Sequence, residues 1–472
     1  MSHTVEKIGG TSMSRLNELL EPLFLSGGDD PYGRVFVVSA FGGITNLLLE
    51  HKKTGEQGVY ARFANADNDH GWHEALDRVA EAMRSAHREV LSHAGDVERA
   101  DEFVRDRIEG ARNCLIDLHR LCAYGHFRLA EHMLQIRELL SGLGEAHSAF
   151  VTTLMLQRAG LNARRVDLTG WRDDGDVSLD ERITSAMEGV DPMSEMPIVT
   201  GYAQCVDGLM KEFDRGYSEV TFSRIAALTG AREAIIHKEF HLSSADPNIV
   251  GQDAVRKLGR TNYDVADQLS NMGMEAIHPK AAKTLRQADV PLRVTNAFEP
   301  GDPGTLIDDQ PAETAAVEIV TGLDIITLEL FEQDMVGVKG YDAAILDVLK
   351  RHNVRIVSKV SNANTITHYL DSSLKTMRRV ERDLQGLYPA ASISARPMAM
   401  AAVIGRDLNG LSVLTRGLQA IAGADLEAVG ASQGPRNVDV QFIFERDALQ
   451  PAIKALHAAF IENQPTELRR AA

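Results

Sequence analysis

Near the N-terminus the chain reads Val5-Glu6-Lys7-Ile8-Gly9-Gly10-Thr11-Ser12. A short strand-like segment leads here directly into two glycines and two hydroxyl side chains. Glycines let backbone N–H groups approach a phosphate closely, and a neighbouring lysine can lie across the β and γ oxygens. The spacing differs from that of a Walker A loop. The pattern therefore predicts either a phosphate-binding loop or an ordinary strand–turn–helix connection.

Short, nearly continuous apolar runs recur through the first three hundred residues. They lie at 35–39, 197–200, 233–237 and 292–295. Strands buried on both faces have this composition, and helical stretches alternate with them here. The sequence therefore predicts an α/β sandwich with a mainly parallel sheet. Apolar residues at helical spacing predict a helical insertion at about 60–140.

The C-terminal third of the chain contains an internal repeat. Residues 299–314 are rich in Pro, Gly and acidic side chains and mark a boundary. An Asp-x-x-Gly turn at Asp334 then recurs at Asp407, each time in the order strand, helix, strand, strand, helix. This order predicts two small ferredoxin-like units.

These patterns divide the chain into three predicted domains. The first spans residues 1–312 and carries the helical insertion. The two repeats follow as residues 318–392 and 393–472. Tandem units of this kind resemble paired ACT domains, which bind small amino acids at their interfaces. A module that serves only in packing or dimerisation is the alternative.

Composition and charge restrict the classes of function. The 472 residues carry a formal net charge of −17, which gives no electrostatic footprint for nucleic acid or anionic membranes. No apolar run approaches the roughly 18 residues of a membrane span, and no signal peptide is expected. The three cysteines have no paired spacing, so neither a disulfide framework nor a protein-held metal is predicted. We expect a cytoplasmic protein without nucleic-acid or membrane partners.

Several segments resemble, in order, the motifs of the aspartate kinases of the amino-acid kinase superfamily. After the N-terminal motif come Val37-Val38-Ser39-Ala40-Phe41-Gly42-Gly43-Ile44-Thr45-Asn46-Leu47, Leu143-Gly144-Glu145, Asp214-Arg215-Gly216-Tyr217-Ser218-Glu219, Ser244-Ala245-Asp246-Pro247 and Gly273-Met274-Glu275-Ala276-Ile277-His278-Pro279. The resemblance covers almost the whole chain. It implies the three-layer amino-acid-kinase sandwich followed by two ferredoxin-like ACT domains. The implied reaction converts ATP and L-aspartate to ADP and 4-phospho-L-aspartate.

Two segments are similar, more narrowly, to the specialised aspartate kinases of ectoine biosynthesis. They are the N-terminal motif through Met13 and Ile236-His237-Lys238-Glu239-Phe240-His241. This similarity implies the first step of the aspartate pathway, dedicated here to ectoine synthesis. General amino-acid synthesis is the alternative.

The implied reaction needs positioning and charge neutralisation rather than a general base, because the aspartate side chain is already ionised near pH 7. By resemblance, Lys7 would be the catalytic residue that stabilises the transferring phosphoryl group, helped by Gly9, Gly10 and a Mg²⁺ ion. The resemblance also implies that Thr11, Ser12 and Asp246 bind phosphate or ATP. Lys238 departs from the family pattern and is expected to supply positive charge to the phosphates. A solvated surface lysine is the alternative for Lys7.

The resemblance also implies the residues that hold L-aspartate. Arg215 would grip the α-carboxylate with a bidentate fork, with Ser218 beside it. Glu145 would accept the substrate ammonium. Ser39 and Thr45 would line the end of the pocket that holds the reactive carboxylate. The alternatives are a surface ion pair, a helix-face glutamate and buried strand hydroxyls.

The nucleotide half departs from the family pattern. The altered positions are His237-Lys238-Glu239, Ser243, Asn248 and Glu275, together with Lys211, Glu212 and Tyr217 near the aspartate motif. These changes leave open a catalytically inactive amino-acid-sensing ACT protein. A related carboxylate kinase of the same superfamily that uses glutamate is the other alternative. Beyond its substrates, the expected partners are an amino-acid effector at the ACT domains and a second copy of the chain, forming a dimer through those domains.

Overall fold

The computed structural model describes residues 2–25, 31–51, 54–65, 70–173, 175–213, 216–274, 276–310 and 314–463. The chain forms two compact units. The first comprises Met1–His241 and Ile277–Asp309, and the second comprises Leu242–Ala276 and Gln310–Ala472. Within the described ranges, no helix combines the length and the apolar character that crossing a bilayer would require.

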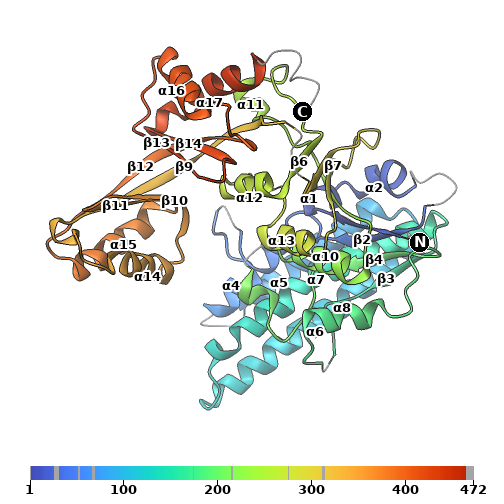
Figure 1. Ribbon diagram of the computed structural model, residues 1–472. Helices are drawn as coiled ribbons and strands as arrows, with labels where there is room; N and C mark the ends of the chain where they lie inside the picture. The colour runs from blue at the N-terminus through green and yellow to red at the C-terminus, as the bar shows by residue number, and fades with distance from the viewer. Residues whose placement is uncertain are drawn as a thin grey trace. The chain divides into compact units, whose positions relative to one another are not determined.

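A mainly parallel sheet forms the centre of the first unit (Figure 1), and its strands follow the order β3-β4-β2-β1-β5-β7-β8. The bounds are β1 (Thr4–Ile8), β2 (Arg34–Val38), β3 (Ala163–Val166), β4 (Met196–Thr200), β5 (Glu233–Lys238), β7 (Leu292–Asn296) and β8 (Thr305–Asp308). The pairs are parallel except for β7 with β8, which is antiparallel. Strand β1 is buried along its whole length, as expected for a central parallel strand. The predicted α/β class is confirmed.

Helices surround this sheet, and three long ones occupy the stretch predicted to be helical. The bounds are α1 (Gly10–Met13), α2 (Leu16–Leu19), η1 (Leu20–Phe24), α3 (Ile44–Leu48), α4 (Val59–Ala64), α5 (His70–Val90), α6 (Ala94–Ala123), α7 (Leu129–Arg158), α8 (Leu179–Met187), α9 (Leu209–Glu212), α10 (Tyr217–Thr229) and α13 (Pro279–Gln287). Helix α7 runs from the insertion into the core of the unit, since it packs on β3 and β4.

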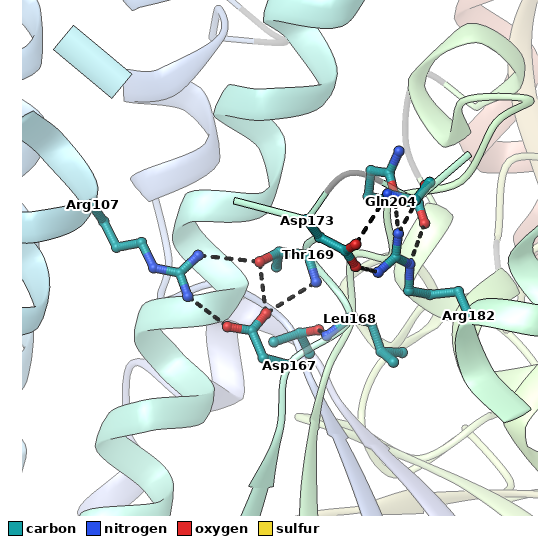
Figure 2. A network of polar contacts seen from close by, with 9 residues as sticks. Arg107, Asp167, Leu168, Thr169, Asp173, Arg182 and Gln204 are labelled. Carbon is teal, nitrogen blue, oxygen red and sulfur yellow. Dashed lines mark hydrogen bonds and ion pairs between the residues drawn. The ribbon is translucent and has the colours of Figure 1, made fainter. Parts of the chain in front are cut away.

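Two buried arginines fix the loop that follows β3 (Figure 2). Arg107 from α6 pairs with Asp167 at 2.6 Å and donates to the Thr169 hydroxyl at 3.2 Å. Arg182 from α8 pairs with Asp173. Because α6 packs along α7, these bonds also support the helix that carries Glu145.

The second unit is built on an antiparallel sheet in the order β10-β11-β9-β12-β14-β13. Its elements are α11 (Pro247–Val250), β6 (Arg260–Asn262), α12 (Tyr263–Asn271), β9 (Ala316–Phe331), η2 (Gln333–Met335), α14 (Tyr341–Arg351), β10 (Arg355–Ser361), β11 (Thr365–Asp371), α15 (Leu374–Leu387), β12 (Ser392–Arg406), α16 (Val413–Gly423), β13 (Gly430–Gln433), β14 (Asp439–Phe444), η3 (Arg446–Ala448), α17 (Leu449–His457) and η4 (Ala458–Glu462). The predicted repeat is present as β9-α14-β10-β11-α15 followed by β12-α16-β13-β14-α17.

The long strands β9 and β12 join the two repeats into one sheet. They pair from Ala316 with Arg406 to Phe331 with Ser392, and Figure 1 shows them running between α14 and α15 at one end and α16 and α17 at the other. A ferredoxin-like unit needs four strands, but each repeat contains three. Each repeat therefore completes its sheet with half of the other repeat's long strand, so the two ferredoxin-like units are interleaved rather than simply consecutive.

Candidate active site

A cavity of about 440 Å³ lies at the carboxyl ends of β1 and β2. Ligands of α/β proteins bind at this edge of the sheet, where the loops after the strands converge. The predicted site residues among those lining the cavity are Gly10, Thr11, Ser39, Thr45, Glu145 and Ser218. The structure thus brings together most of the predicted aspartate side and part of the phosphate loop.

Glycines allow the loops after β1 and β2 to meet helix α7. A Cβ atom on Gly10 would lie 2.9 Å from the carbonyl oxygen of Ala40, and one on Gly144 would lie 2.6 Å from the Ala40 Cβ. Both distances are shorter than side chains tolerate. The glycines of two separate motifs are therefore required by one point of close approach, next to Glu145.

Lys7 forms an ion pair with Glu219 from α10, with Nζ 3.4 Å from Oε1. Both side chains are largely buried, with exposures of 10% and 12%. The other carboxylate oxygen, Oε2, accepts a hydrogen bond from the backbone N–H of His278 at 2.5 Å. Burial favours a raised pKa for Glu219, but the charges of Lys7 and Lys238 and the His278 N–H outweigh it and lower the pKa. Two lysines from neighbouring strands therefore act on one carboxylate.

The same carboxylate links two motifs that lie far apart in the sequence. Glu219 is the last residue of the motif that begins at Asp214, and His278 caps the first turn of α13. Gly216 has a φ of +85°, and a Cβ there would lie 2.7 Å from the His278 ring. The role of Glu219 as the partner of Lys7 was missed in the sequence analysis, although its position at the end of the motif was a signal.

Glu145 is a buried carboxylate in the wall of the cavity, with 2% of its surface exposed. Its Oε1 accepts a hydrogen bond from the Tyr217 hydroxyl at 2.9 Å, whereas its Oε2 has no hydrogen-bond partner among the described residues. Burial raises the pKa of Glu145 to about 7, against the opposing effects of the Tyr217 hydroxyl and of Lys7. A buried carboxylate with a free oxygen is suited to a cationic ligand group.

Two serines lie beside Glu145. The hydroxyls of Ser39 and Ser218 are 3.3 Å apart. Gly201, directly after β4, packs against this group: a Cβ there would lie 2.8 Å from the Ser218 Cβ and 3.5 Å from the Glu145 Cγ. Gly201 was not singled out from the sequence, because its neighbours come from other segments. Thr45 reaches the cavity from the first turn of α3.

The first of the departures around β5, His237, belongs to a buried network. The His237 ring contacts Glu6 through Nε2 at 2.8 Å and Thr295 through Nδ1 at 2.9 Å. Arg34 donates two hydrogen bonds to Glu6, each 2.7 Å long. Burial would raise the pKa of Glu6, but Arg34 and His237 outweigh it and hold that pKa far below its usual range. His237 is therefore a structural residue of the sheet, held between β1 and β7.

Other predicted ATP-binding residues have different surroundings. The Ser12 hydroxyl donates to Glu239 at 2.6 Å, so it already has an acceptor. Gly9 precedes α1. Asp246 belongs to the second unit and caps α11 by accepting from the Asn248 N–H at 2.8 Å. Arg215 lies outside the described residues. The roles assigned to these residues stay predictions.

Comparisons with known proteins agree with this architecture. The model of the amino acid kinase family matches residues 3–296. The chain is 51% identical over 464 residues to the aspartate kinase Ask_Ect of Stutzerimonas stutzeri (strain A1501), covering 98% of each chain. It is 25% identical to aspartokinase 3, chloroplastic, of Arabidopsis thaliana, covering 98% of this chain and 82% of that protein.

Solved structures show the same fold. The E. coli aspartokinase III in complex with lysine and aspartate matches with a TM-score of 0.72 at 19% identity, covering 97% of this chain and 99% of that one. The Clostridium acetobutylicum aspartate kinase matches with a TM-score of 0.71 at 17% identity, covering 97% and 100%. These structures show the fold, and the family model and the 51% identical relative show the family: the chain belongs to the amino acid kinase family and, within it, to the aspartate kinases.

Proposed function

We propose that this protein transfers the γ-phosphoryl group of ATP to the side-chain carboxylate of L-aspartate. The observation that carries the proposal is Glu145, a buried carboxylate with one unpartnered oxygen in the wall of a cavity. Lys7 is held nearby, at the end of β1, and its charge helps to lower the pKa of Glu145. A substrate with an ammonium at one end and an anion at the other complements this pair of charges.

The reaction joins two anions, so neutralising charge is the main task of the site. An oxygen of the aspartate side chain forms a bond to the γ-phosphorus, the bond from that phosphorus to the β,γ-bridging oxygen breaks, and ADP leaves. Lys7 would stabilise the transferring group, and Lys238 would add a second positive charge. Gly9, Gly10 and Thr11 would lie along the phosphates.

Mg²⁺ would enter with ATP as part of the substrate. Within the described ranges, no group of three or more His, Cys, Asp or Glu residues is suited to hold a metal ion. Glu219 is already engaged by Lys7 and the His278 N–H. Mg²⁺ commonly binds nucleotide phosphates while keeping several waters, so its contribution here would be to neutralise phosphate charge.

At the aspartate end, Glu145 would accept the ammonium, and Ser218 would lie beside it. Ser39 and Thr45 would line the pocket near the reactive carboxylate, because they follow β2 at the rim of the cavity. Arg215 would bind the α-carboxylate. This last role rests on the motif resemblance alone.

Trapping the product as a hydroxamate tests the function. The full chain is incubated with Mg·ATP, hydroxylamine and either aspartate or glutamate, and Lys7→Ala is assayed in parallel. We expect hydroxamate with aspartate, little with glutamate, and a lower kcat for Lys7→Ala with nearly unchanged aspartate binding. Product from glutamate would identify the other carboxylate kinase, and product from neither would favour the inactive sensor.

The cellular role and assembly extend this proposal. The 51% identity to Ask_Ect supports a cytoplasmic enzyme dedicated to ectoine synthesis. The second unit would bind an amino-acid effector and join two copies of the chain into a dimer. Support for the effector comes from the similar E. coli enzyme, which was solved in complex with lysine.

A further inference from the structure

We propose that Tyr217 is a positioning residue for recognition of the substrate ammonium. It holds one oxygen of Glu145, so that the other is presented to the amine. This inference rests on the proposed function and adds to it a residue outside the predicted site. Tyr217 is also a position at which the sequence departs from the resembled family pattern.

The contact geometry shows how Tyr217 orients Glu145. The hydroxyl donates to Oε1 at 2.9 Å, and both residues are buried and line the cavity. Oε2 has no hydrogen-bond partner in the described part of the chain. A carboxylate held at one oxygen has little freedom to rotate. Oε2 is itself buried, so an ammonium that reaches it meets a carboxylate whose orientation is already fixed.

The Tyr217 ring packs beside a second tyrosine, whose hydroxyl makes a separate hydrogen bond to the same helix. The ring packs edge-on against Tyr202, with centroids 5.8 Å apart and planes at 80°. The Tyr202 hydroxyl donates to Glu138 at 2.5 Å, and Glu138 also accepts from the Met210 N–H at 2.6 Å. Glu138 and Glu145 both lie on α7. Helix α7 thus supplies two carboxylates: Glu145, which accepts from Tyr217, and Glu138, which accepts from Tyr202.

The hydroxyl has a second consequence, which concerns protonation. Glu145 must be ionised to accept an ammonium. The groups that favour its ionised form are the Tyr217 hydroxyl from α10, the Ala40 backbone beyond β2 and the Lys7 charge from β1. Removing the hydroxyl removes one of these contributions, so the pKa of Glu145 should rise further above its present value of about 7.

The test compares Tyr217→Phe with a matched control, Tyr202→Phe. Each variant loses one tyrosine hydroxyl that donates to a buried glutamate of α7 and keeps its ring. For Tyr217→Phe we expect KM for aspartate to rise about 10-fold with a smaller change in kcat. The acidic limb of its kcat/KM profile should move to higher pH, and its preference for aspartate over succinate should fall.

Tyr202→Phe separates positioning from general packing. It should lower the melting temperature but leave KM, the acidic limb and the preference over succinate near wild-type values. Tyr217 would be a packing residue if its Phe variant kept the wild-type KM and pH profile. A control variant that reproduced all three changes would also overturn the proposal, because a loosened core would then explain them. Wild-type protein that formed no hydroxamate from aspartate would instead refute the function itself.

Discussion

Replacing Glu145 by Gln should stabilise the unliganded protein at alkaline pH while removing its activity. Folding raises the pKa of this carboxyl from an ordinary 4.5 to about 7. Between these values the folded state binds more protons than the unfolded state, so stability is lost as pH rises through this window. At about 1.36 kcal/mol per pKa unit, the loss is roughly 3 kcal/mol at pH 8 and about 1 kcal/mol at pH 5. Gln carries no charge and avoids this loss.

Thermal melts of both proteins at pH 5 and pH 8 measure the effect. The variant should gain roughly 2–3 kcal/mol at pH 8, which corresponds to about 5 °C or more for a unit of this size. At pH 5 the gain should shrink to about 1 kcal/mol, so the melting temperatures should differ correspondingly less. Glu131→Gln is the matched control, because Glu131 is an exposed residue of the same helix. It should change the melting temperature little at either pH.

Aspartate links this stability effect to function. Its ammonium should pair with the ionised Glu145, so adding aspartate should raise the wild-type melting temperature at pH 8. The same addition should have much less effect on the variant. The reasoning is refuted if Glu145→Gln melts at the wild-type temperature at pH 8, because the buried carboxylate would then carry no penalty in the folded state.

Two further predictions concern stability at acid pH and the second unit. His147 is buried with its Nε2 3.1 Å from the His87 Nδ1, and burial together with the His87 charge lowers its pKa to about 3. The folded state therefore keeps this ring neutral, whereas the unfolded chain binds a proton below the usual pKa of 6.5. The free energy of unfolding should fall by roughly 2 kcal/mol from pH 7.5 to pH 5. His147→Gln should flatten this part of the urea-midpoint profile, and an unchanged slope would assign it to other groups. Calorimetric titration of the full chain with lysine, threonine and other amino acids should show saturable binding of an effector, whereas no heat with any of them would leave the second unit a role in assembly alone.

Much of the first unit could be predicted because local patterns specify it. The strand-like segment of β1 ends at two glycines, and the structure places a strand end and a loop there, with Gly10 against Ala40. Glu145 could be assigned from a short motif, and it is buried at the cavity as that assignment requires. These features could be predicted because each is specified by a short stretch of consecutive residues or by a short family motif.

The features missed from the sequence depend on contacts between distant segments. Glu219 meets Lys7 and His278 only because α10 packs against both β1 and α13. Gly201 is required by the Ser218 side chain of α10 and the Val38 carbonyl oxygen of β2. The pairing of β9 with β12 could not be predicted from either repeat alone. The pattern of one repeat predicts its own strands, but not the strand of the other repeat that completes its sheet.

The buried network bears on whether the altered nucleotide motif still permits catalysis. Glu6 forms hydrogen bonds with both Arg34 and His237 in the sheet. Removing one partner of such a network leaves another polar group buried without a hydrogen bond. The histidine of the altered motif is thus explained by its bond to Glu6 rather than by loss of a nucleotide contact. Side chains alternate along a strand, so Lys7 and Lys238 point away from the face that carries this network. Both lysines instead act on Glu219, so Lys7 of the N-terminal motif and Lys238 of the altered motif together place two positive charges at the end of the sheet where the phosphates would lie.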